Sequence, residues 1–192
     1  MKTKKLLLIC LGVIILIMMS GCGDKANPKI QVEMEDGGIF VIELYPEYAP
    51  KTVDNFVKLV KQGFYDGVTF HRIVDGFMAQ GGDPDGTGMG GSGETITGEF
   101  SSNGFTKNTL KHTKGVISMA RSGDPNSASS QFFIMLDAHS SLDGDYAAFG
   151  KVIEGMKVVE DFQKVERTMN SMREKATPVN PVVMKKVTVL SE

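Results

Sequence analysis

The fold of this chain is decided by the stretch Phe70-His71-Arg72-Ile73-Val74-Asp75-Gly76-Phe77-Met78-Ala79-Gln80-Gly81-Gly82-Asp83. It embeds a cation, Arg72, and an amide, Gln80, among bulky apolar residues. A second dense segment runs from Gly115-Val116-Ile117-Ser118-Met119-Ala120 through a loop to Ser130-Gln131-Phe132-Phe133-Ile134. Charged and amide side chains are seldom buried without a partner. The two segments therefore predict a site that holds a ligand more than one that breaks a bond.

Short strands are expected around these segments. Apolar and polar residues alternate over 30–34 and 40–44, on either side of Asp36-Gly37-Gly38, which predicts a β-hairpin. Helical spacing predicts one helix over 50–62, with Pro50 in its first turn, and a second that carries Met156, Val159 and Phe162. Further strands are expected at 68–74, 115–120, 131–136, 146–152 and 182–190. Many short strands with two helices indicate a β-barrel or sandwich.

Composition places the chain among globular proteins. Of its 192 residues, 41% are hydrophobic, 23% charged and 8% aromatic, which excludes disorder, collagen and coiled coil and fits one domain. The formal net charge is -2, and Lys2, Lys4 and Lys5 all precede Cys22, so a chain beginning there would be more acidic. We therefore expect no nucleic-acid partner.

The N-terminal segment has the layout of a delivery signal. The basic start precedes an apolar run over residues 6–19, which is shorter than the roughly 20 residues that cross a bilayer as a helix. Met19-Ser20-Gly21-Cys22 then resembles a bacterial lipobox, with Met19 in place of the usual Leu. We expect a signal peptide over 1–21, a lipidated Cys22 (diacylglyceryl, palmitate) with a short polar tether over 22–28, and a folded domain over 29–192.

A lipidated N-terminus would determine where the protein is located and whether it can form a disulfide. Cys10 would leave with the signal, so the mature chain would carry one cysteine and no disulfide. A diacylated cysteine anchors stably, whereas one acyl chain does not. The expected location is extracytoplasmic, lipid-anchored to the bacterial cell membrane, with the absence of disulfides leaning toward a Gram-positive surface over a periplasmic face. We expect a monomer.

The sequence lacks the common motifs of metal-dependent and nucleophilic catalysis. His71, His112 and His139 share no metal-ligand spacing, and no serine lies in a Gly-x-Ser-x-Gly elbow, so we expect neither a metal nor a cofactor. Glycine makes up more than half of residues 81–93, yet the segment lacks the lysine and the following helix of a phosphate loop. We interpret it as an irregular surface loop and His71 as a satisfied structural histidine.

Both dense segments resemble those of the cyclophilins, the cyclophilin-type peptidyl-prolyl cis-trans isomerases. Phe149-Gly150-Lys151-Val152 and Gly155-Met156 also match, and the similarity runs from about Ile30 to Leu190. The resemblance implies a mainly β fold, a closed eight-stranded antiparallel β-barrel capped by two α-helices. It also implies proline-containing polypeptides as substrates and an active site made of Arg72, Phe77, Met78, Gln80, Ala120, Gln131, Phe133 and Leu142.

The roles in that site follow from the reaction. An X-Pro bond interconverts between two isomers over a barrier of about 20 kcal/mol because rotation breaks amide resonance. A protonated Arg72 can donate to the lone pair of the twisted nitrogen, with Gln80 holding its guanidinium. The apolar side chains would seat the proline ring, while Gln131 and the backbone of Arg121 anchor the preceding residues. Isomerases of this kind accelerate folding, here of exported proteins.

Some positions depart from the family pattern. Ser141 stands where well-known cyclophilins have a Trp, and Tyr146 where they have a His; the chain has no Trp. Ser141 implies weak cyclosporin binding, and Tyr146 can still donate a hydrogen bond. Arg121 at the rim of the pocket would favour acidic residues near the proline. The alternative function is a proline-peptide binding module or holdase chaperone in which isomerisation is incidental. An extracellular hydrolase or a nucleotide-binding protein is not expected, because the chain lacks both a nucleophile and a phosphate loop.

Overall fold

The computed structural model describes residues 26–192. The expected signal peptide and Cys22 lie outside these residues. Two α-helices and ten strands are formed, together with three short 3-10 helices, η1 (Ser101–Asn103), η2 (Ser140–Leu142) and η3 (Phe162–Lys164). The main elements are β1 (Lys29–Met34), β2 (Ile39–Leu44), α1 (Pro50–Lys61), β3 (Arg72–Val74), β4 (Met78–Gly81), β5 (Val116–Met119), β6 (Phe132–Met135), β7 (Ala148–Glu154), α2 (Met156–Asp161), β8 (Arg167–Met169), β9 (Lys175–Pro178) and β10 (Met184–Ser191).

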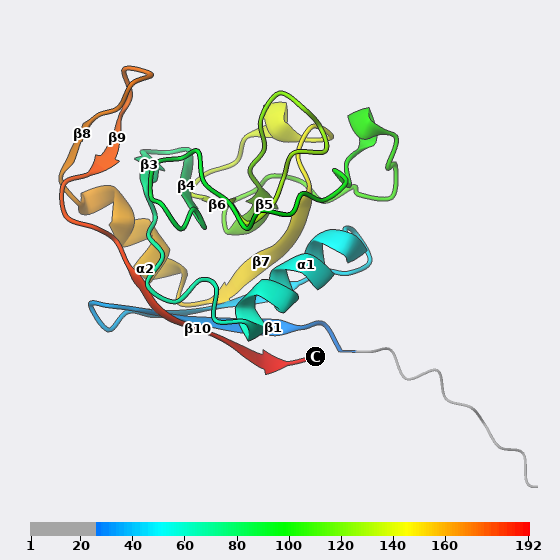
Figure 1. Cartoon of the computed structure of the whole chain (residues 1–192), viewed down its shortest axis with the longest axis horizontal. Helices are drawn as coiled ribbons and strands as arrows, with labels where there is room; N and C mark the ends of the chain where they lie inside the picture. The colour runs from blue at the N-terminus through cyan, green and yellow to red at the C-terminus, as the bar shows by residue number, and fades with distance from the viewer. Residues whose placement is uncertain (1–25) are drawn as a thin grey trace, which may run out of the picture.

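Eight of the strands form one antiparallel sheet in the order β10-β1-β2-β7-β5-β6-β4-β3. The sheet curls, and its two edges approach through the isolated bridge between Thr69 and Val183 (Figure 1). No continuous strand ladder joins β10 to β3 within residues 26–192. The fold is therefore a mainly β, curled half-barrel with two helices, and the closed barrel implied by the resemblance is not formed by ladders.

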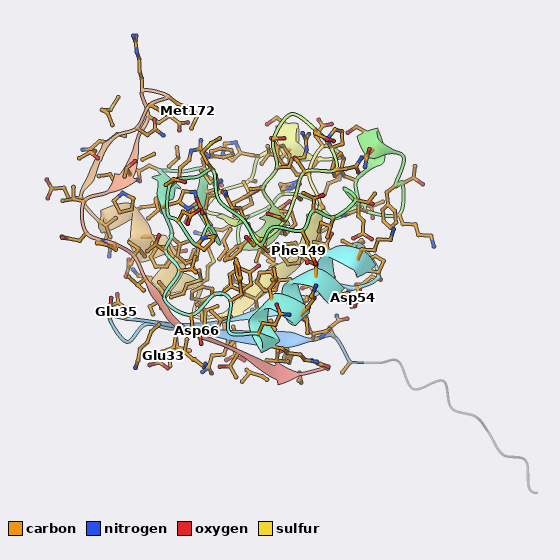
Figure 2. The ribbon with its side chains drawn as sticks, in the orientation of Figure 1. Glu33, Glu35, Asp54, Asp66, Phe149 and Met172 are labelled. Carbon is orange, nitrogen blue, oxygen red and sulfur yellow. The ribbon has the colours of Figure 1, made fainter. Side chains whose placement is uncertain are left out.

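The core fills the inside of this curl. Phe56 of α1 packs on Phe132 and Phe149, with ring centroids 5.4 and 5.2 Å apart, and Phe149 is seen in the interior in Figure 2. The N-terminus of α1 is capped from a distance, because the buried carboxylate of Glu99 accepts hydrogen bonds from the backbone N–H groups of Lys51 and Thr52. This contact fastens the long irregular segment between β4 and β5 to the helix.

The hairpin β1–β2, both helices and strands β5, β6, β7 and β10 confirm the sequence prediction to within a few residues. Two differences matter for the site. The apolar stretch from residue 70 contains two strands, because Gly76, with φ 62°, turns the chain back between β3 and β4. The hairpin β8–β9 was not predicted, since its sequence is polar and lacks alternation.

The elements are arranged so that the chain ends lie apart from β3 and β4. Lys29, the first residue of β1, pairs with Ser191 near the C-terminus. In Figure 1 the C-terminus lies at the lower edge of the molecule near β1 and β10, while the hairpin β8–β9 projects at the upper left beside β3. Within the described residues, no helix is long and apolar enough to span a bilayer.

Candidate active site

The hairpin β3–β4 sets the first face of the site. Its register pairs Arg72 with Gln80 and Val74 with Met78. Alternate residues of a strand point to opposite faces, so Arg72, Met78 and Gln80 share one face, while Ile73 and Ala79 are fully buried in the main core. Strand β6 then places Phe133 opposite Gln80. A cation and an amide thus lie beside an aromatic ring, which is the grouping that the family resemblance implies.

A hollow of about 240 Å³ lies over this face. The residues that line it come from β3, β4, β6, the loop after β5, and the segment around η2. They are Arg72, Phe77, Met78, Gln80, Ala120, Arg121, Phe133, Leu142 and Tyr146. The structure therefore brings together nine of the ten predicted pocket residues, and the tenth, Gln131, contacts Gln80 at the edge. A larger hollow of about 730 Å³, between Ala26, α1 and Glu192, contains none of them.

The guanidinium of Arg72 is held from two sides. Its Nη1 donates to Oε1 of Gln80 at 3.2 Å and lies 3.8 Å from Sδ of Met78. Its Nε and Nη2 donate to the two carboxylate oxygens of Glu174, at 2.9 and 2.8 Å. These four contacts hold the flexible side chain of Arg72 in place without a bound substrate.

An amide chain extends this arrangement. Gln80 Nε2 donates to Oε1 of Gln131 at 2.8 Å, and Gln131 Nε2 donates to the carbonyl of Gly90 at 2.8 Å. Because each amide uses one oxygen and one nitrogen, the orientation of all three groups is linked from Arg72 to the glycine-rich segment.

The apolar part of the pocket has its own small core, separate from the main one. Met78 and Phe133 are buried in it, while Phe77, Leu142 and Tyr146 are partly exposed against it. The rings of Phe133 and Tyr146 pack edge to face at 5.7 Å. A buried base under an open rim is suited to a small apolar ring.

A polar triad lies beneath Phe133. The ring of His112 stacks on Phe133 at 6.0 Å and contacts Asp143 Oδ1 and Ser118 Oγ, each at 3.1 Å. Burial lowers the pKa of His112, although Asp143 acts in the opposite direction. Ser118 is fully buried, so this triad supports the pocket and offers no accessible nucleophile.

Arg121, the cation at the rim of the pocket, is hydrogen-bonded to backbone carbonyls. Arg121 donates through Nε and Nη2 to the carbonyl of Asp145 and through Nη1 to that of Ser122. Its guanidinium lies 4.7 Å from the ring centre of Tyr146 and 5.1 Å from that of Phe100. Its charge therefore stays at the rim in a fixed position.

The glycine-rich segment is more than the surface loop we expected. It lines a second hollow of about 460 Å³ that adjoins the first and shares Gln80, Ala120 and Arg121 with it. Backbone N–H groups of Asp85, Gly88 and Gly90 donate to the carboxylate of Asp83, and they lower its pKa although burial opposes them. A side chain at Gly90 would strike that carboxylate, which explains the glycine.

Sequence reasoning missed Glu174 and misjudged His71. Glu174 lies 102 residues from Arg72 along the chain, in a polar hairpin that gives no local signal of its contact. His71 is not satisfied: neither ring nitrogen has a hydrogen-bond partner among residues 26–192, and burial lowers its pKa. Both side chains acquire their surroundings only when distant segments pack.

Sequence and structure comparisons identify the family of the chain. Residues 29–189 match the family model of the cyclophilin type peptidyl-prolyl cis-trans isomerase/CLD. Peptidyl-prolyl cis-trans isomerase B of Bacillus subtilis is 47% identical over 128 residues, covering 67% of this chain and 85% of its own. Peptidyl-prolyl cis-trans isomerase ppi1 of Schizosaccharomyces pombe is 43% identical over 169 residues, covering 86% and 99%. A crystal structure of a Cryptosporidium parvum cyclophilin type isomerase superposes with a TM-score of 0.70 at 30% identity, covering 86% and 99%.

The fold and its relatives define an enzyme that accelerates rotation about the bond before proline in polypeptide substrates. The chain belongs to the cyclophilin-type peptidyl-prolyl cis-trans isomerases.

Proposed function

We propose that Arg72 is the catalytic residue and that the pocket around it binds the proline. The observation that carries this proposal is the position of Arg72 Nη1, which contacts Gln80 and Met78 at the wall of the 240 Å³ hollow. Rotation makes the prolyl nitrogen pyramidal and restores its lone pair. A donor there binds the twisted state more strongly than the planar one, and such differential binding lowers the barrier.

The apolar side chains hold the ring that must stay still. Phe77, Met78, Phe133 and Leu142 surround the space beside Arg72, and burial of a proline-sized group there contributes about 1.5 to 3 kcal/mol. The backbone of Arg121 and the side chain of Gln131 hold the residues before the proline, next to Ala120 and under the hydroxyl of Tyr146. The substrate is then fixed on both sides of the rotating bond.

The proposed setting is the outer face of a bacterial membrane, where the enzyme would act on exported proteins as they fold. The support is in the sequence: a basic start, a short apolar run and the segment Ser20-Gly21-Cys22. Metabolic labelling with a palmitate analogue, followed by mass spectrometry of the N-terminal peptide, tests this setting. We expect a lipid on Cys22 and its loss, with release of the protein from membranes, in Cys22→Ala; an unlipidated wild-type chain would exclude the anchor.

Two-dimensional exchange NMR on a short Xaa-Pro peptide tests the site. We expect residues 26–192 to accelerate cis-trans exchange, and Arg72→Ala to lose most of that acceleration while still binding the peptide. Arg72→Lys keeps the charge without the planar fork and should recover little. Peptide binding without acceleration by the wild type would favour a proline-peptide binding module or holdase, and full activity of Arg72→Ala would exclude Arg72.

A further inference from the structure

The hairpin β8–β9 is fastened to the catalytic strand at its base. Arg167 of β8 donates through Nη1 to the carbonyl of Ile73 at 3.1 Å and through Nη2 to Asp75 at 2.8 Å. The side chain of Arg167 is 6% exposed, whereas that of Asp75 is 65% exposed, so the bond to the carbonyl of Ile73 is the one that lies out of water and is stronger than a surface contact. The base of the hairpin therefore moves with β3.

The turn of the same hairpin presents one carboxylate to the site. Asn170 Oδ1 accepts from the backbone N–H of Glu174, and Asn170 Nδ2 donates to Glu174 Oε2 at 2.9 Å. Met172, in the same turn, is exposed, and Figure 2 labels it near the outer end of the hairpin. The carboxylate of Glu174 thus points toward Arg72 from a turn that is otherwise exposed, and the hydrogen bonds of Asn170 fix the orientation of that carboxylate.

The contact with Glu174 occupies only one edge of the Arg72 guanidinium. Glu174 takes the Nε and Nη2 edge in a bidentate pair, which is the geometry of the strongest arginine–carboxylate contacts. Nη1 is left toward Met78 and Gln80. Glu174 itself does not line the hollow, so it reaches the reaction through Arg72 alone.

We propose that Glu174 is a positioning residue for prolyl isomerisation, which holds the plane of the Arg72 guanidinium so that Nη1 points at the prolyl nitrogen. The inference rests on the proposed role of Arg72. The two side chains are only 21% and 32% exposed, so the pair is shielded compared with an ordinary surface ion pair. Preorganisation of this kind saves the ordering of a long side chain at the transition state, and small displacements of a catalytic group cost rate heavily.

The test variant is Glu174→Gln, which keeps the size of the side chain and removes its charge and one acceptor. The matched control is Glu166→Gln, the same change at an exposed position just before β8. Exchange NMR over a range of peptide concentrations gives the rate on the enzyme and the peptide affinity separately. We expect kcat to fall about tenfold in Glu174→Gln with KM within about twofold, and the control to match the wild type.

A second readout follows the guanidinium directly. The Nε–H signal of Arg72, which is bonded to a carboxylate, should exchange slowly with water in the wild type and rapidly in Glu174→Gln. Glu174→Asp should restore part of both the signal and kcat. A kcat that is unchanged or raised in Glu174→Gln while Arg72→Ala is inactive would overturn the positioning role and leave the role of Arg72 intact; an active Arg72→Ala would instead remove the proposed function.

Discussion

Gln80 Nε2 donates a hydrogen bond of 2.8 Å to Gln131 Oε1, and this contact links side chains of the two sequence segments whose strands β4 and β6 pair beneath the pocket. Gln80 also accepts from Arg72 Nη1. An apolar residue of similar size, introduced by Gln80→Leu, removes both bonds and leaves Arg72 free to move on that side. We expect kcat/KM in exchange NMR to fall about tenfold.

The same variant should leave the fold nearly unchanged, because Gln80 is only half-buried at the edge of the hollow. Urea unfolding of Gln80→Leu and of the wild type should give midpoints that agree closely. A large loss of stability would instead mean that Gln80 is part of the core, and its effect on activity would then say little about Arg72.

The base and the rim of the proline pocket should respond differently to truncation. Phe133 is 5% exposed and packs on Tyr146 and His112, so Phe133→Ala should lower the free energy of unfolding by about 3 kcal/mol or more. Leu142→Ala, at the partly exposed rim, should cost about 1 kcal/mol or less and weaken peptide binding.

Urea denaturation and peptide titration of both variants separate the two effects. If Leu142→Ala binds the peptide as tightly as the wild type, the ring does not sit against this side chain.

Ser141 should set the response to cyclosporin. It is exposed on η2 beside Leu142, at the position where the family resemblance implies the Trp of well-known cyclophilins. We expect weak inhibition of the wild type and an inhibition constant at least about tenfold lower for Ser141→Trp, because the indole adds apolar contact and a donor. Basal isomerase activity serves as the control and should stay near the wild-type value.

The free energy of unfolding should fall as the solution is acidified through the pH at which an ordinary histidine titrates. Burial lowers the pKa of His112, and that of His71, below 6.5, so the unfolded chain takes up these protons first. Protons bound more tightly by the unfolded state make stability rise with pH over that window. The free energy of unfolding should therefore decrease between about pH 7 and pH 5.

His112→Asn should reduce this slope while lowering stability at pH 7, because Ser118 and Asp143 lose a partner. His71 should maintain part of the slope. Urea titrations at several pH values measure both, and an unaltered slope in His112→Asn would place the titration elsewhere.

Local patterns account for what sequence could predict. The alternation over β1 and β2 and the apolar face of α1 are properties of a few consecutive residues, so these elements were expected at nearly their observed positions. The pocket residues from Arg72 to Tyr146 came from the family resemblance, and the structure brings them to one hollow. Their individual roles stay predictions.

Long-range contacts account for what sequence could not predict. The pair between Arg72 and Glu174 joins two polar positions in separate hairpins, and neither hydrophobic period nor turn chemistry indicates it. The place of the glycine-rich segment beside Gln131 has the same origin, since hydrogen bonds from Ser130 to the carbonyl of Gly82 and from Gln131 to the carbonyl of Gly90 hold it there. Such contacts depend on how the sheet curls, which no short window of sequence contains.

The separation between the start of β1 and the hairpin β3–β4 has a consequence for access. Lys29 pairs with Ser191 near the C-terminus, and Figure 1 shows the C-terminus well apart from the hairpin β3–β4, which carries Arg72. In an enzyme held by a lipid at Cys22, the membrane attachment would lie on the side of the domain where β1 begins, which takes no part in the proposed reaction. The pocket would then open toward the surrounding medium, where a polypeptide emerging from an export channel can pass through it without first approaching the bilayer.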